Sequence, residues 1–248
     1  MNINSGQICY VLPVHNEAEI LRESVNKITE YLSEHTANSF LVLVENGSSD
    51  DSLAIAKDIA NETKNESIAA ISVPRAGLGH ALHAGVEKAL EIQKENKLSD
   101  MWIVLTAADL PFGFSDFESF LKWQANHKET RIAVGSKAHN SSSMNTSLKR
   151  KIMSLIYRLA RFLILGMKTK DSQGSIFVHA SVAKDINVKI KSRDFFYSTE
   201  FIYYAEKNKC KVGELPVVEQ GFRRPSTVKP LRDGLGMLLQ LFKLRFRH

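Results

Sequence analysis

The chain has 248 residues, of which 44% are hydrophobic and 24% charged, a balance that excludes intrinsic disorder and allows a sizeable core of α/β size. Two cysteines, Cys9 and Cys210, are too few for a disulfide framework, and no apolar run is long enough to span a bilayer. The net charge of +6 gathers in residues 141–170 and 221–248, which carry seven Lys or Arg each, so we expect a polyanionic partner.

Strand and helix patterns alternate over the first 137 residues. The expected strands are 7–15, 39–46, 67–74, 101–111 and 131–137, and the expected helices are 17–35, 51–62, 77–96 and 114–127. This alternation predicts an α/β fold with a mostly parallel sheet flanked by helices on both faces. Ligands of such sheets bind beyond the carboxyl ends of the strands. Polar residues follow several of these ends: Asn16, Glu17, Glu45, Asn46, Asp109 and Lys137.

The second half of the chain has a different pattern. A polar loop over 139–147 precedes a basic amphipathic helix over 148–166, in which Arg150, Ser154, Arg158 and Arg161 share one helical face. A helix around Glu200, an edge strand near 212–218 and a second amphipathic segment over 231–248 follow. With no repeat and no linker in sight, we expect a single domain over 1–248 with halves 1–140 and 141–248.

Eight short motifs in a fixed order carry a family resemblance. They are LPVHNEAE, VENGSSDDS, GLGHALHAG, TAADLP, VGSK, KDSQGS, STEFIYYA and RRPSTVK. The set resembles the family-two glycosyltransferases, and most of all the dolichyl- and polyprenyl-phosphate mannosyl- and glucosyltransferases. The resemblance implies a GT-A-type, Rossmann-like nucleotide-binding domain. It also implies an inverting transfer of a hexose from a UDP- or GDP-linked sugar to a polyprenyl phosphate, with 1–140 binding the donor and 141–248 the acceptor.

The resemblance places donor recognition at four turns. The residues are Pro13, His15, Asn16 and Glu17 after the first strand, Glu45 and Asn46 after the second, Gly79 at a helix start, and Ala108 and Asp109 after the fourth. Asn, Glu and helix N-termini are suited to hydrogen-bond bases, ribose and anions. The same residues also suit capped turns, with Asn16 as a helix N-cap.

A metal ion is expected at Asp109. Related enzymes place two aspartates in an Asp-x-Asp pattern here, whereas this chain has Ala107 in the first position. Mg²⁺ or Mn²⁺ often uses one or two carboxylates together with phosphate oxygens and waters, so a single acid can suffice. The alternative is a turn-forming acid ahead of Pro111.

A lipid phosphate acceptor needs positive charge rather than a general base, because it is already ionised near neutral pH. By resemblance, the acceptor and diphosphate contacts are Lys137, Arg150, Ser154, Glu200, Arg224 and Lys229. Lys137 replaces the usual arginine, which keeps the charge but loses the bidentate fork. Asp171 and Gln173 would line the sugar and acceptor pocket as catalytic residues with Asp109. For Glu200 the structural alternative is a buried ion pair with Arg150.

Residues 148–168 and 231–247 mix basic and apolar side chains, which suits a membrane surface. The alternatives are packing on the domain or on a second subunit. Since the first ten residues lack the pattern of a signal peptide, we expect a cytoplasmic protein, peripheral at the cytoplasmic face of a membrane. No nucleic-acid motif accompanies the basic segments. The competing functions are transfer to a hydroxyl group, with Asp171 or Glu200 as base, and nucleotide binding by a degenerate homologue without turnover.

Overall fold

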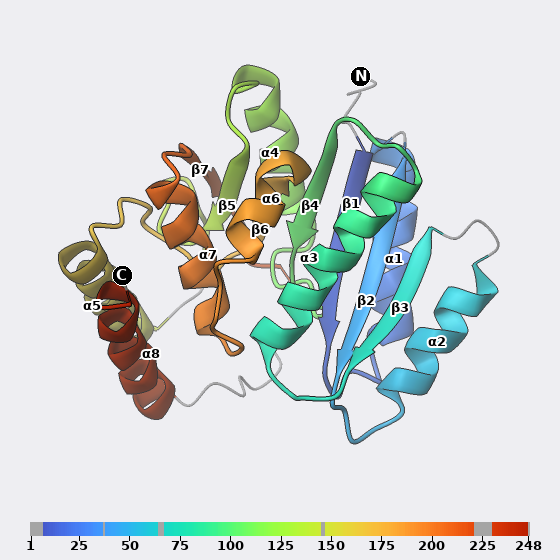
Figure 1. Ribbon diagram of the computed structural model, residues 1–248, viewed down its shortest axis with the longest axis horizontal. Coiled ribbons are helices and arrows are strands. Elements are labelled where there is room, and N and C mark those ends of the chain that lie inside the picture. Colours follow the sequence, from blue (N-terminus) through green and yellow to red (C-terminus); the bar gives the residue numbers. More distant parts are fainter. Residues whose placement is uncertain (1–6, 37, 64–66, 145–146, 221–229, 248) are drawn as a thin grey trace.

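The computed structural model describes residues 7–36, 38–63, 67–144, 147–220 and 230–247, with the side chains of 230–235 outside the described part (Figure 1). The strands are β1 (Gln7–Val14), β2 (Ser39–Asn46), β3 (Ile68–Val73), β4 (Met101–Leu105), β5 (Ile132–Ser136), β6 (Ile176–His179) and β7 (Val212–Pro216). The helices are α1 (Leu21–His35), α2 (Ser52–Glu62), α3 (Leu78–Glu95), α4 (Ser115–Asn126), α5 (Leu148–Leu165), α6 (Ala180–Asn187), α7 (Phe196–Lys207) and α8 (Pro230–Arg245).

All seven strands form one sheet in the order β3-β2-β1-β4-β6-β5-β7. Only β6 runs antiparallel to its neighbours, β4 and β5, so the sheet is mostly parallel, as predicted. The strand predicted near 212–218 is confirmed as the edge strand β7. The sequence did not predict β6 or α6, because four apolar-rich residues run directly into a short helix with no Gly or Pro to mark the boundary.

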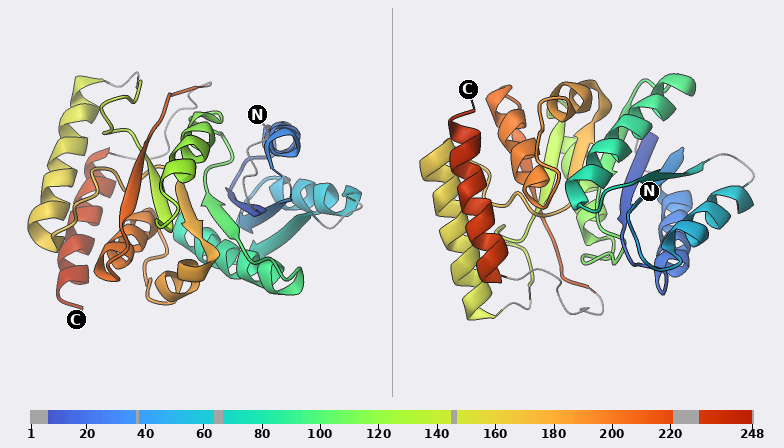
Figure 2. Two further views of the ribbon diagram at one scale, coloured as in Figure 1. Left: turned by 90° about the horizontal axis from the view of Figure 1, so that it is seen from above. Right: turned by 60° about the horizontal axis from the view of Figure 1, so that its bottom comes forward.

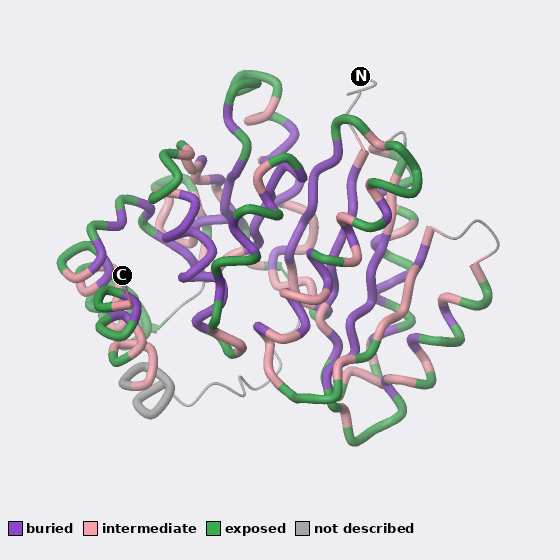
Figure 3. Tube along the Cα trace, viewed as in Figure 1, coloured by how far each residue is buried: buried purple, intermediate pink, exposed green. Residues whose placement is uncertain are grey.

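Successive side chains along β1 point to opposite faces of the sheet and pack into two separate hydrophobic cores. Ile8, Tyr10 and Leu12 pack on one face of the sheet with α1, α2 and α4. Cys9 and Val11 pack on the other face with α3, α6 and α7. This is the two-residue period of a strand buried on both sides, and Figures 1 and 3 show the buried strands between the two helical layers.

Helices α5 and α8 lie side by side at the far end of the sheet, next to α7 (Figures 1 and 2). The side chain of Ser147 accepts a hydrogen bond from the N–H of Arg150 to begin α5, and Gly166, with φ of 72°, ends it. Among the described residues, none of the helices combines the length and apolarity that crossing a bilayer requires.

His179 links β4 to the start of α6 and gives the fold a testable pH dependence. Its Nδ1 accepts from the N–H of Ser181, and its Nε2 lies 3.0 Å from the carboxylate of Asp100. Burial lowers the pKa of His179, and Asp100 only partly offsets this. The unfolded chain therefore takes up the proton first, so this residue's contribution to stability is lost as the pH falls below about 6.5.

We expect His179→Gln to reduce the free energy of unfolding at pH 7.5 by about 1–2 kcal/mol, because the cap and a hydrogen bond are lost. The loss of stability between pH 7.5 and 5.5 should also become smaller, although His80 and His83, whose pKa values burial lowers too, retain part of it. Urea titrations at several pH values measure both effects. The exposed His127→Gln is the matched control. An unchanged pH dependence in His179→Gln would contradict this role.

Candidate active site

The carboxyl ends of the parallel strands meet at one edge of the sheet and bring most of the predicted residues together. Asn16 and Glu17 follow β1, Asn46 ends β2, and Asp109 follows β4. Because β6 is antiparallel to both β4 and β5, the end of β5 and Lys137 lie at the same edge. The predicted placement at the strand ends is therefore confirmed.

The turns after β1 and β2 are locked together by hydrogen bonds. His15 Nδ1 lies 3.0 Å from the carbonyl oxygen of Asn46, and the N–H of Asn16 donates to the hydroxyl of Ser48 (3.1 Å). Asn16 has φ of 56°, and its side-chain oxygen accepts from the N–H of Ser49 (2.8 Å). Since α1 begins at Leu21, five residues later, with Ile20 as its N-cap, the alternative of Asn16 as a helix cap is wrong.

Glu45 and Asn46 have different environments. Both carboxylate oxygens of Glu45 accept hydrogen bonds within the protein, one from the N–H of Ser48 in the turn and one from the hydroxyl of Ser72 on β3. Burial raises the pKa of Glu45, but these hydrogen bonds outweigh it and hold the pKa below its usual range. The side-chain oxygen of Asn46 is buried and has no hydrogen-bond partner among the described residues. Asn46 is thus the better placed of the two to meet a ligand.

Gly79, predicted to approach the nucleotide, is in close contact with the chain itself. A Cβ atom on Gly79 would lie 2.6 Å from the carbonyl carbon of Arg193. The missing side chain therefore lets the backbone of Arg193 and Asp194 pack against the start of α3.

Asp109 stands exposed at the turn after β4, next to the buried Ala108. The following residue, Leu110, has φ of 44°, which makes the turn tight. Across the residues that the structure describes, no group of three or more His, Cys, Asp or Glu side chains could hold a metal ion by itself. The site therefore fits Mg²⁺ or Mn²⁺ only as one carboxylate shared with phosphate oxygens and waters.

Lys137, Asp171 and Gln173 form one hydrogen-bonded cluster. The Nζ of Lys137 donates to the carbonyl oxygen of Gln173 (3.1 Å) and lies 3.5 Å from the carboxylate of Asp171. The N–H groups of Lys137 and Gln173 each donate to one oxygen of that carboxylate, at 2.9 Å. Burial raises the pKa of Asp171, but Lys137 and the two N–H groups outweigh it, and the net pKa is lowered. Asp171 is therefore an ionised acid whose two oxygens both accept hydrogen bonds, and it is poorly suited to take up a proton.

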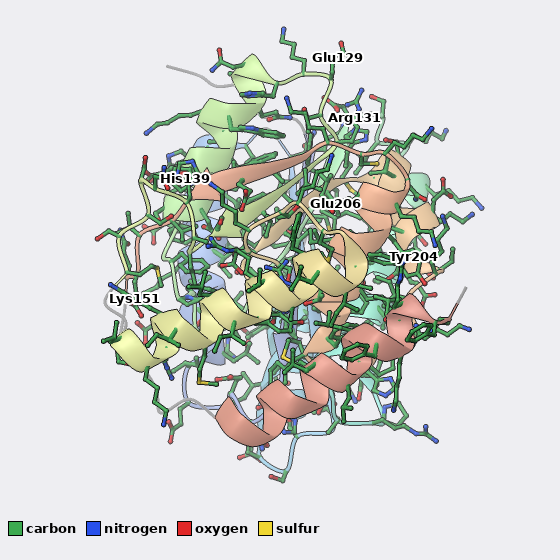
Figure 4. The ribbon with its side chains drawn as sticks, turned by 90° about the vertical axis from the view of Figure 1, so that its left-hand side faces the viewer. Glu129, Arg131, His139, Lys151, Tyr204 and Glu206 are labelled. Atoms are coloured by element: carbon green, nitrogen blue, oxygen red, sulfur yellow. The ribbon has the colours of Figure 1, made fainter. Side chains whose placement is uncertain are left out.

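The irregular segment 168–171 is held by three charged residues that the sequence did not single out for this role. Glu206 accepts from the first two N–H groups of the segment, and Glu214 from the other two. Arg161 donates to two of its carbonyl oxygens, at 3.2 and 2.7 Å. Arg161 is only 2% exposed, whereas Arg150 and Ser154, nearer the start of the same helix, are exposed. Figure 4 shows Glu206 close to the C-terminal end of α5.

Glu200 is fully buried in α7. Its carboxylate accepts from the N–H groups of Lys191 and Ser192 and pairs with Arg247. The alternative of a buried ion pair between Glu200 and Arg150 is therefore wrong, because the ion-pair partner of Glu200 is Arg247. Two other predicted phosphate contacts, Arg224 and Lys229, lie outside the described residues.

Several known proteins resemble this chain in sequence. A family model described as glycosyl transferase family 2 matches residues 9–189. A UDP-N-acetylglucosamine–dolichyl-phosphate N-acetylglucosaminyltransferase of Methanococcus voltae is 25% identical over 223 residues, covering 85% of this chain and 84% of the relative. An uncharacterized protein of Methanocaldococcus jannaschii is 28% identical over 218 residues, covering 87% and 82%.

Solved structures share the fold. Glucosyl-3-phosphoglycerate synthase from Mycobacterium tuberculosis, in complex with Mn²⁺, UDP-glucose and phosphoglyceric acid, superposes with a TM-score of 0.62 at 15% identity. The superposition covers 97% of this chain and 80% of that one. At 15% identity, this structural similarity shows a shared fold and nothing about the substrates.

Proposed function

The chain belongs to glycosyltransferase family 2, and on that premise we propose that it transfers a hexose, with inversion, from a UDP- or GDP-linked sugar to a polyprenyl phosphate at a membrane surface. That it is a transferase with a GT-A fold follows from the family match and the structural neighbours. The identity of the acceptor as a lipid phosphate is the part of the proposal that goes beyond the family match. It is supported by the Methanococcus voltae relative, whose name gives dolichyl phosphate as its acceptor.

In this proposal the donor binds across the turns after β1, β2 and β4. The unpartnered oxygen of Asn46 is available to the nucleoside, and the interlocked turns hold that residue in place. Asp109 would hold Mg²⁺ or Mn²⁺ together with diphosphate oxygens. A bound ion of this kind supplies the positive charge that offsets the leaving nucleoside diphosphate.

The acceptor chemistry follows from the cluster around Lys137. An oxygen of the lipid phosphate forms a bond to the anomeric carbon while the bond from that carbon to the diphosphate breaks. No proton has to leave the acceptor, because a phosphate monoester is ionised near neutral pH. The ammonium group of Lys137 would bring the two anions together, and Asp171 fixes its position at 3.5 Å. The lowered pKa of Asp171 and the burial of Glu200 weigh against transfer to a hydroxyl group, which needs a general base.

The observation that most supports a lipid acceptor is an exposed apolar surface on α5 and α8, here called the α5–α8 surface. Its large apolar side chains are Leu148, Ile152, Leu155, Ile156, Leu159, Phe162 and Leu163 of α5, with Leu239, Phe242 and Phe246 in and just after α8. Helix α5 carries five Lys or Arg and no acid. An apolar stripe bordered by cations fits the surface of an anionic bilayer. Through Arg161, the same helix holds the segment that ends at Asp171.

We expect Leu159→Glu in this surface to weaken binding to vesicles of phosphatidylglycerol and phosphatidylcholine by about tenfold or more. Withholding one leucine from an apolar phase costs about 1.5–3 kcal/mol, and the added charge is repelled by the anionic surface. Vesicle co-sedimentation measures the effect, with the exposed Val188→Glu in the loop after α6 as the matched control. If vesicle binding were unchanged while a dimer dissociated, the surface would be a subunit interface instead.

The proposed function is tested by transfer itself. Purified protein is incubated with Mn²⁺, a short polyprenyl phosphate and a panel of UDP- and GDP-sugars, and lipid-linked sugar is detected by mass spectrometry. Thermal shift with each nucleotide, with and without Mn²⁺, identifies the donor. Formation of a polyprenyl-phosphate sugar supports the proposal. Nucleotide binding without transfer from any donor would support a degenerate, binding-only protein.

A further inference from the structure

A buried carboxylate in α7 connects α8 to the start of α3. Glu200 is 0% exposed and is satisfied from two sides. The N–H groups of Lys191 (3.2 Å) and Ser192 (2.9 Å) donate to it from the loop before α7, and the guanidinium of Arg247 donates from the turn after α8. A buried charge needs such partners, so the positions of the loop and of Arg247 depend on each other.

The loop that Glu200 holds, residues 190–194, presses against the start of α3. The carbonyl oxygen of Arg193 accepts from the N–H of His80 at 3.3 Å. A Cβ on Gly77 would lie 2.5 Å from that oxygen, so the loop occupies the space a side chain would fill. On the other side, a Cβ on Gly47 would lie 3.1 Å from the backbone nitrogen of Ala76. The contacts therefore run from Arg247 through the loop to the turn that follows Asn46.

A second contact ties α8 to the same loop. The side-chain amide of Gln240 donates to the carboxylate of Asp194 at 2.7 Å. Leu241 and Leu244 of α8 are fully buried, while Leu239 and Phe242 on the same helix are exposed in the α5–α8 surface. One helix thus contacts the loop on its inner side and presents apolar side chains on its outer side.

We propose that Glu200 is a positioning residue, which together with Arg247 holds loop 190–194 as a wall of the donor site and so makes donor affinity depend on the docking of α8. This inference rests on the proposed function for the location of the donor site at the turn after Asn46 and the start of α3. When α8 is released, Glu200 loses its ion pair with Arg247 and Asp194 loses its hydrogen bond from Gln240, so only the N–H groups of Lys191 and Ser192 still hold the loop to the buried carboxylate. Only a fraction of the molecules then has the loop in the position that forms the wall, and the apparent donor affinity falls in proportion to this fraction.

The test is nucleotide binding by Arg247→Gln, with Arg245→Gln as the matched control, because Arg245 is an exposed arginine two residues away with the same charge. Isothermal titration with UDP and Mn²⁺, and in parallel with GDP and Mn²⁺, is performed at a temperature where circular dichroism shows the variants folded. We expect about tenfold weaker binding by Arg247→Gln of the nucleotide that the wild type prefers, and a change of less than twofold for Arg245→Gln. In transfer assays the donor KM should rise with little change in kcat, a split that lower stability alone would not produce.

Gln240→Ala provides an independent variant, since it cuts the second anchor without leaving a buried charge unpaired. It should weaken nucleotide binding in the same direction. Unchanged nucleotide affinity in both Arg247→Gln and Gln240→Ala, with a wild type that binds and transfers, would overturn this inference and leave the proposed function intact. A wild type that binds neither UDP nor GDP would overturn both.

Discussion

Replacing Asp109 with asparagine is expected to lower kcat/KM for the donor by at least about 100-fold. The amide keeps the shape of the side chain but removes the negative charge proposed to hold a divalent ion against the diphosphate. Loss of one electrostatic contact to a group that gains charge in the transition state typically costs 100- to 1000-fold. Initial rates at several Mn²⁺ concentrations measure the effect. The exposed Asp185→Asn is the control, since it lies in α6, which begins at the opposite edge of the sheet.

The converse variant, Ala107→Asp, sharpens this prediction. It restores an acid two residues before Asp109, at a position that is partly exposed. A second carboxylate should lower the half-saturating Mn²⁺ concentration several-fold, because more negative charge faces the ion. If Asp109→Asn kept the wild-type rate and Mn²⁺ dependence, and Ala107→Asp changed neither, Asp109 would be only a turn residue ahead of Pro111.

Replacing Lys137 with methionine is expected to lower kcat/KM for the lipid phosphate by about 100- to 1000-fold. Methionine is similar in length but carries no charge, so two anions would have to meet without a cation between them. Lys137 is also the strongest of the influences that lower the pKa of Asp171. Removal of the lysine should raise the pKa of Asp171. On acidification, the variant should therefore begin to lose stability at a higher pH than the wild type does.

Lys137→Arg tests whether the charge alone is required, because arginine keeps the positive charge and can form two parallel hydrogen bonds to a phosphate. We expect it to retain activity within about tenfold of the wild type. Lys122→Met, an exposed lysine on α4, controls for the loss of one surface charge. Assays varying the acceptor concentration distinguish binding from turnover. Equal activities of Lys137→Met and the wild type would show that the acceptor phosphate binds elsewhere.

The fold could be predicted largely from patterns that act over a few residues. Short apolar-rich runs in β1 and β2 indicated buried strands, and the alternation of strands with helices indicated a sheet covered on both faces; the structure confirms both. The antiparallel β6 was missed because IFVH is too short to establish a period and passes directly into α6. Its direction depends on pairing with β4 and β5, which are distant in the sequence.

The candidate site was predictable where it follows strand ends and less so where it depends on long-range ion pairs. Spacing put Arg161 on a face with Arg150, but nothing local indicated that its guanidinium would hold residues 169 and 170. In the same way, Glu200 pairs with Arg247, 47 residues away. For Glu200 the one available signal was a charged residue within a strongly apolar helix, because such residues are buried only with partners. Arg161 lies in a helix with four other cations and gave no such signal.

The central claim is that an already ionised lipid phosphate attacks the donor beside Lys137 without a general base. Its most direct test compares a short polyprenyl phosphate with the polyprenol of the same chain length, under identical donor and Mn²⁺ concentrations, between pH 7 and 9. We predict transfer to the phosphate alone, at a rate that varies little over this range, because the acceptor and Asp171 are both already ionised. Transfer to the polyprenol, rising with pH and abolished in Asp171→Asn, would contradict the account.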